Sequence, residues 1–138
     1  MDSFTKQLKS LHPTTIINFS CIAHFKPSEY TELNVPGVYF LVLEKAFGRV
    51  VGSSNVLYIG CSGMKKNQNQ GMLGRLRNTR SKKYGVILSH IQKASTCMKI
   101  KVILYQSENP LEIEKLLLSS YLETYFELPP LNSHLPSK

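Results

Sequence analysis

A single carboxylate lies among apolar residues near the C-terminal end of the sequence. Asn109 as N-cap and Pro110 in the first turn are typical of a helix start, and the pattern predicts a helix that runs to about Tyr125. The apolar stripe of this helix comprises Leu111, Leu117, Leu118, Tyr121 and Tyr125. At about 100° per residue, Glu114 lies at the centre of the stripe. A carboxylate that faces a core needs a partner, so Glu114 is either a satisfied core residue or a metal ligand or acid–base group.

Two tyrosines lie in segments that are typical of β-strands. Tyr39 belongs to the apolar run 37–43. Tyr58 belongs to the run 55–60, which is rich in β-branched and aromatic residues. Each run has a glycine at one end, where a ligand could approach the backbone closely. Tyrosine in a strand is normally a packing residue, so these two positions alone do not indicate a site.

Charge of one sign fills the middle of the chain. The 138 residues carry 17 Lys and Arg against 9 Asp and Glu, a formal net charge of +8. Residues 45–107 contain no Asp or Glu. Such a block favours a polyanionic partner, nucleic acid, over a basic surface kept for solubility. The candidate nucleic-acid contacts after the second strand run are Lys65, Lys66, Arg77, Arg80, Lys82 and Lys83.

Other classes of protein are disfavoured by what the sequence lacks. Three cysteines and four histidines are scattered without a CxxC pair, which argues against a structural zinc site or a disulfide framework. The longest apolar run, 38–43, is too short to span a membrane. The first ten residues lack the apolar core of a signal peptide. We therefore expect an intracellular protein, cytoplasmic or nuclear, with no membrane partner.

The order of the expected elements predicts an α/β fold with helices on a small sheet. Strands are expected at 37–43, 55–60 and 99–105, in a three-stranded mixed or antiparallel sheet joined in part by a hairpin over 44–54. Helices are expected at 72–80, at about 84–94 and at about 110–125. This β-β-α-α-β-α domain occupies 37–132. Residues 1–36 form an N-terminal extension with a short helix and a strand, and residues 133–138 form a tail.

The two strand runs resemble the paired motifs of the GIY-YIG nuclease superfamily. Gly37-Val38-Tyr39 is similar to the first motif, with Val38 in place of isoleucine. Tyr58-Ile59-Gly60 is similar to the second. The connection between the motifs is longer than is usual in the family, which suggests a protruding hairpin.

The rest of the family pattern follows in the same order. Arg75 matches the arginine of the first helix, although Thr79 stands where many members have a histidine one turn later. Glu114 matches the glutamate of a later helix, and Asn132 ends a Pro-x-Asn match after a long interval. The resemblance covers roughly residues 36–132 and implies the same β-β-α-α-β-α core.

The resemblance implies a metal-dependent DNA endonuclease that uses one Mg²⁺ or Mn²⁺ ion. Glu114 would hold the metal, and Arg75 would neutralise charge on the phosphate in the transition state. Tyr39 would take the proton from the attacking water, directly or through another water, and Tyr58 would orient the nucleophile or the phosphate. An ordinary tyrosine pKa of about 10 is too high for this task unless nearby positive charge lowers it. Asn132 would support the site by hydrogen bonding.

The DNA contacts and the biological role stay open within this interpretation. Gly60 would leave room for the DNA strand, and Lys65 and Lys66 would contact its backbone. Specificity would come from residues 44–54, residues 61–71, the N-terminal extension, a homodimer or a partner protein. Restriction, repair, phage, mobile-element and toxin roles all fit. Two alternatives remain: a non-catalytic nucleic-acid-binding module with the same fold, and an RNA-binding protein.

Overall fold

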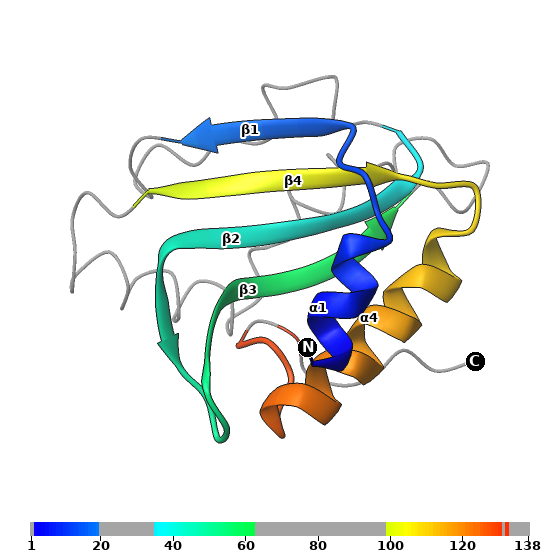
Figure 1. The fold of residues 1–138 in the computed structure, drawn as a ribbon. Helices are drawn as coiled ribbons and strands as arrows, with labels where there is room; N and C mark the ends of the chain where they lie inside the picture. Colours follow the sequence, from blue (N-terminus) through cyan, green and yellow to red (C-terminus); the bar gives the residue numbers. More distant parts are fainter. Residues whose placement is uncertain (1, 20–34, 63–98, 131, 133–138) are drawn as a thin grey trace.

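The described part of the chain is an antiparallel sheet with two helices on one face (Figure 1). The computed structural model describes residues 2–19, 35–62, 99–130 and 132. In chain order the elements are α1 (Ser3–Lys9), β1 (Thr15–Phe19), β2 (Gly37–Gly48), β3 (Ser53–Ser62), β4 (Ile100–Gln106) and α4 (Pro110–Tyr125). In these ranges no helix is both long and apolar enough to cross a membrane. The presence of helices packed on a sheet confirms the α/β class that the sequence predicts.

The sheet has four strands in the order β1-β4-β2-β3, and every pairing is antiparallel. The expected three-stranded sheet is therefore wrong. The additional strand, β1, comes from the N-terminal segment and pairs with β4, with Ile17 opposite Val102. Ile17 is buried in this position, so the pairing hides apolar surface that β1 alone could not bury. The expected helices at 72–80 and 84–94 lie outside the described residues.

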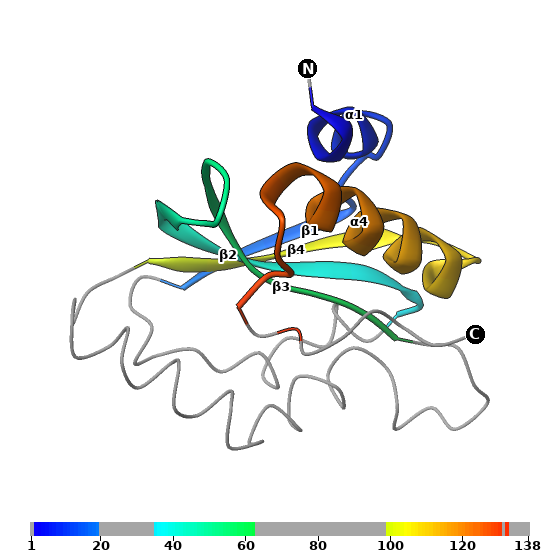
Figure 2. The ribbon, with the colours of Figure 1, turned by 90° about the horizontal axis from the view of Figure 1, so that it is seen from below.

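The two helices cover one face of the sheet, with α4 next to the strands and α1 on its outer side (Figure 2). The core on this face contains Val38, Phe40, Val42, Val56, Ile59, Leu117, Leu118 and Tyr121. Phe4 of α1 completes it, because its ring lies 5.0 Å from that of Tyr121 and 6.3 Å from that of Phe40. Asp2 caps α1 by accepting a 2.7 Å hydrogen bond from Thr5 N–H. The N-terminal segment is thus packed into the same core as α4.

The opposite face of the sheet is apolar as well. Side chains alternate along a strand, so the neighbours of Val38 and Phe40 in β2 point away from α4. These neighbours are Tyr39, Leu41 and Leu43, which lie opposite Leu104, Val102 and Ile100 of β4. All six are buried, so both faces of the central strands are covered.

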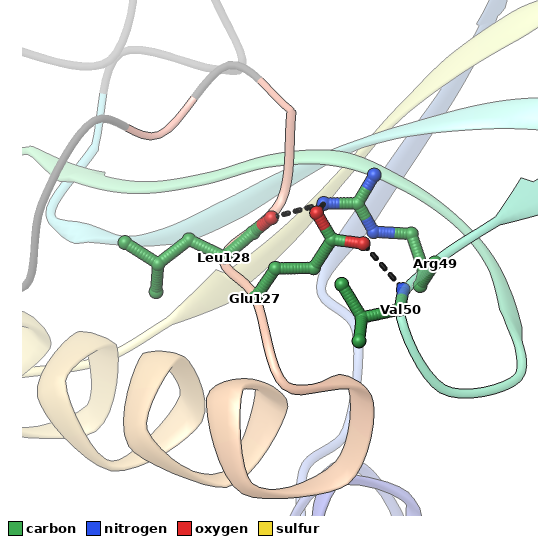
Figure 3. Close-up of polar contacts among 4 residues, drawn as sticks. All are labelled: Arg49, Val50, Glu127 and Leu128. Atoms are coloured by element: carbon green, nitrogen blue, oxygen red, sulfur yellow. Dashed lines mark hydrogen bonds and ion pairs between the residues drawn. The ribbon is translucent and has the colours of Figure 1, made fainter.

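The β2–β3 hairpin is anchored to the chain after α4 (Figure 3). Arg49 forms an ion pair with Glu127 at 3.1 Å and donates to the carbonyl of Leu128. The other carboxylate oxygen of Glu127 accepts from Val50 N–H. We call these contacts of Arg49, Val50, Glu127 and Leu128 the hairpin clamp. They connect two segments that are 79 residues apart in sequence.

Candidate active site

The two motif tyrosines come together on the face of the sheet that points away from α4. Tyr39 lies opposite Gly60, and Leu41 lies opposite Tyr58, in adjacent strands β2 and β3. The tyrosine ring centroids are 5.8 Å apart and the rings are tilted by 47°. Tyr39 is 1% exposed, whereas Tyr58 is half-buried. The pairing register, which sequence alone does not fix, makes the two phenols neighbours.

Only glycine fits at position 60, because the rings of Tyr39 and Tyr58 fill the space that a Cβ atom would need. A Cβ on Gly60 would lie 2.8 Å from Cζ and Oη of Tyr39 and 2.8 Å from Cε2 of Tyr58. A Cβ atom essentially never approaches another heavy atom this closely, so any larger residue would displace a phenol. The glycine therefore lets two aromatic rings share one small area of the sheet.

Asn132 fixes the strand segment between Tyr58 and Gly60. Its Oδ1 accepts from Ile59 N–H at 3.0 Å, and its Nδ2 donates to the Ile59 carbonyl at 2.9 Å. β3 is an edge strand, and such a strand presents unpaired backbone groups to its surroundings. One side-chain amide satisfies both groups of Ile59. The structure thus brings Asn132 to the second tyrosine motif.

Glu114 is buried in α4, as the helical spacing predicts. The residue is 8% exposed, while Glu112 on the same helix is exposed. α4 begins four residues after β4 ends, and β4 ends where Gln106 pairs with Gly37. Glu114 therefore lies toward the same end of the sheet as Tyr39 and Gly60. It belongs to the helix that covers the other face.

The described residues show whether the protein itself could supply a complete set of metal ligands. Among residues 2–19, 35–62, 99–130 and 132, no group of three His, Cys, Asp or Glu side chains could hold a metal. Mg²⁺ does not require such a cage, since one or two carboxylates with water and substrate oxygens are the usual ligands. A single buried carboxylate is compatible with that requirement.

Several predicted site residues lie outside the described residues. They are Arg75, the candidate charge-neutralising residue, and the candidate DNA contacts Lys65, Lys66, Arg77, Arg80, Lys82 and Lys83. Of the predicted site, the structure therefore brings together Tyr39, Tyr58, Gly60 and Asn132, and it buries Glu114.

Sequence reasoning missed the hairpin clamp. The side chain of Arg49 is only 11% exposed, and the clamp holds the chain at Leu128, shortly before Asn132. Nothing in the local sequence marks Arg49, because its partners are distant along the chain. Its place in an acid-free block suggested a nucleic-acid contact instead. The clamp is a second support for the segment that carries Asn132.

Comparisons with known proteins identify no relative of this chain. No protein-family model, no curated protein and no solved structure matches the chain.

Proposed function

We propose that the protein is a metal-dependent endonuclease that hydrolyses DNA phosphodiester bonds, as the resemblance to GIY-YIG nucleases implies. One observation carries this proposal: the two motif tyrosines meet above Gly60, with ring centroids 5.8 Å apart. The backbone of β3, the strand of Tyr58, is held at Ile59 by Asn132, the last residue of the motif series. Gly60 leaves the space that the two phenols occupy, which any larger residue would fill.

Each residue of the proposed site has a physical task. Tyr39 accepts the proton of the attacking water, directly or through another water. Tyr58, which is more exposed, orients the water or the phosphate. Arg75 donates to the phosphate oxygens, where a preorganised charge stabilises the developing negative charge. Asn132 keeps the backbone at Ile59, and hence both motif ends, in place.

Glu114 is the proposed metal ligand. A bound Mg²⁺ or Mn²⁺ would polarise the phosphate and stabilise the leaving oxygen. Glu114 is buried, so its charged carboxylate has little contact with bulk water. A buried carboxylate is stable only with a fixed partner, and a metal ion would be such a partner.

The alternative is a nucleic-acid-binding module that does not cleave. The formal charge of +8 favours it as much as it favours a nuclease. Both proposals predict binding that weakens with salt, because phosphate contacts release counterions. Only the nuclease proposal predicts dependence of product formation on Glu114.

The deciding experiment is incubation of the purified full chain with supercoiled plasmid and Mg²⁺. We expect nicked or linear product with Mg²⁺ or Mn²⁺, and none with EDTA. Binding to a fixed duplex is measured in parallel in Ca²⁺, over a series of salt concentrations. Binding with no cleavage under any metal would replace the nuclease proposal by the binding-module proposal. Sequencing the product ends then separates site-specific cutting from scattered nicking.

A further inference from the structure

A cavity of about 480 Å³ lies at the end of the sheet away from the tyrosines. It is lined by Asn18, Val42, Leu43, Glu44, Asn55, Lys99, Ile100 and Lys101. We call it the strand-end cavity. Its volume is within the range of about 300–1,000 Å³ that is typical of small-molecule sites. It is larger than a lone inorganic anion requires.

The polar lining of the strand-end cavity comes from every strand of the sheet. Asn18 of β1 and Val42 of β2 both pair with Lys101 of β4, so these three residues form one row across the sheet. Glu44 N–H donates to the carbonyl of Lys99 at 2.9 Å. Glu44 and Lys99 therefore form a second row, beyond the row of Val42 and Lys101. Asn55 comes from β3. Residues far apart in sequence thus converge on one place.

Four of the polar lining residues are exposed, namely Asn18, Glu44, Asn55 and Lys99. Asparagine and lysine are depleted in strands, where β-branched and aromatic residues pack better. In the same rows, Val42 on β2 is a buried core residue. Lys101 is half-buried, and in the described part of the chain neither Lys99 nor Lys101 has an ion pair with a carboxylate. Two cations beside one acid, Glu44, leave the strand-end cavity with an excess of positive charge.

We propose that the strand-end cavity binds a nucleotide. Lys99 and Lys101 bind its phosphate, since ammonium groups serve as point charges for phosphate oxygens. The amides of Asn18 and Asn55 and the carboxylate of Glu44 supply donors and acceptors for the base and the sugar. Val42, Leu43 and Ile100 are the apolar lining residues, and they provide the floor for the ring.

The strand-end cavity is separate from the tyrosine site. The part of β2 that lines the cavity is residues 42–44, and neither Tyr39 nor Tyr58 is among the described residues that line it. The nucleotide is either a free mononucleotide or one unit of a nucleic-acid strand, and both present the same phosphate. The inference therefore goes beyond the proposed cleavage and does not depend on it.

The test is a titration of the isotopically labelled full chain, followed by NMR in EDTA so that cleavage cannot interfere. The probes are deoxyadenosine monophosphate, a short single-stranded oligonucleotide and inorganic phosphate. We expect the mononucleotide to shift the amide signals of residues 18, 42–44, 55 and 99–101. Tighter binding of the oligonucleotide would assign the site to a unit of a strand, and equal or weaker binding would assign it to a free nucleotide.

Variants connect the shifts to the proposed contacts. Lys99→Ala/Lys101→Ala should weaken mononucleotide binding at least about tenfold, the usual effect of one charge-assisted hydrogen bond. Asn55→Thr, an exposed change to a good strand former, should weaken it without affecting the fold. The matched control is Lys6→Ala/Lys9→Ala, which removes two exposed charges from α1. Unchanged affinity in both cavity variants, equal affinity for phosphate alone, or no amide shifts would overturn the proposal.

Discussion

Asn132 pairs with Ile59 as a neighbouring strand would. Its amide accepts from the backbone N–H at 3.0 Å and donates to the backbone carbonyl at 2.9 Å, so one side chain continues the hydrogen-bond pattern of β3 at its outer edge. Because Ile59 stands between Tyr58 and Gly60, this contact sets the position of the second tyrosine motif. A carboxamide carries an acceptor oxygen and a donor nitrogen side by side, and these match the N–H and the carbonyl that an edge strand presents.

Replacement of Asn132 by Ala should therefore affect both stability and cleavage. The loss of two partly buried hydrogen bonds should cost about 1–3 kcal/mol of unfolding free energy, and the Ile59 amide should exchange with solvent faster. Urea unfolding and hydrogen exchange measure these effects. Asn109→Ala is the matched control, because the Asn109 side chain makes no capping hydrogen bond to α4. Equal behaviour of the two variants would contradict the role of Asn132.

Gly60→Ala should separate the two phenols. The added methyl group would lie 2.8 Å from both rings, so overpacking should cost about 1–3 kcal/mol of stability and should abolish most cleavage. Gly48→Ala serves as the control, since nothing lies within 4 Å of the added Cβ. That variant should be within about 0.5 kcal/mol of the wild type. A fully active Gly60→Ala protein would mean that the phenols need not be adjacent for the reaction.

Glu114→Gln should reduce cleavage to the background rate while DNA binding in Ca²⁺ is kept. The substitution removes the charge that a metal requires but keeps the shape of a side chain that is 8% exposed. Glu112→Gln, two residues earlier and exposed, should retain full activity. Plasmid cleavage at several Mg²⁺ concentrations checks both variants. Normal cleavage by Glu114→Gln would remove this residue from the proposed site.

Loss of Glu127 should loosen the hairpin clamp. Glu127→Ala removes the ion pair and the acceptor of Val50 N–H, and it leaves the Arg49 guanidinium, 11% exposed, without its carboxylate. We expect a loss of about 1–3 kcal/mol in unfolding free energy. Glu123→Ala, an exposed change on α4, should have almost no effect. If the two variants unfold at the same denaturant concentration, the clamp does not stabilise the fold.

Tyr121→Phe should make the protein less sensitive to alkali. Burial raises the pKa of Tyr121 above 10.0, although the nearby Arg49 charge opposes part of the rise. The folded state therefore holds this proton to higher pH than the unfolded chain does. Its contribution is fully present below pH 10 and is lost as the pH rises through the folded pKa. Thermal unfolding from pH 8 to 11 should show a smaller decrease for Tyr121→Phe than for the wild type.

The same substitution should be tolerated at neutral pH. Tyr121 is completely buried, and its hydroxyl has no hydrogen-bond partner in the described part of the chain. Removing such a group relieves a desolvation cost, so stability should stay the same or increase by up to about 1 kcal/mol. A clear loss of stability at pH 7 would show that the hydroxyl does have a bonding partner.

Local sequence determined the elements that have strong internal patterns. The start of α4 at Pro110 and its end at Tyr125 follow from the proline and from the 3.6-residue period of its apolar face, although the N-cap Asn109 makes no side-chain capping bond. β2, β3 and β4 follow from short runs of β-branched and aromatic residues. β2 and β3 contain the strands expected for them, and β4 begins and ends one residue later than the expected 99–105. The burial of Glu114 follows from the same helical period.

Tertiary structure decided what joins these elements. The pairing of β1 with β4, the approach of Tyr39 to Tyr58, and the contacts of Asn132 and Arg49 all connect segments that are remote or offset in register. A local pattern specifies which side of a strand is apolar, but it does not specify the neighbouring strand or its register. Those choices depend on how much apolar surface the whole chain can bury at once. For that reason the sequence determined the chemical groups and their elements, and only the fold determined which groups meet.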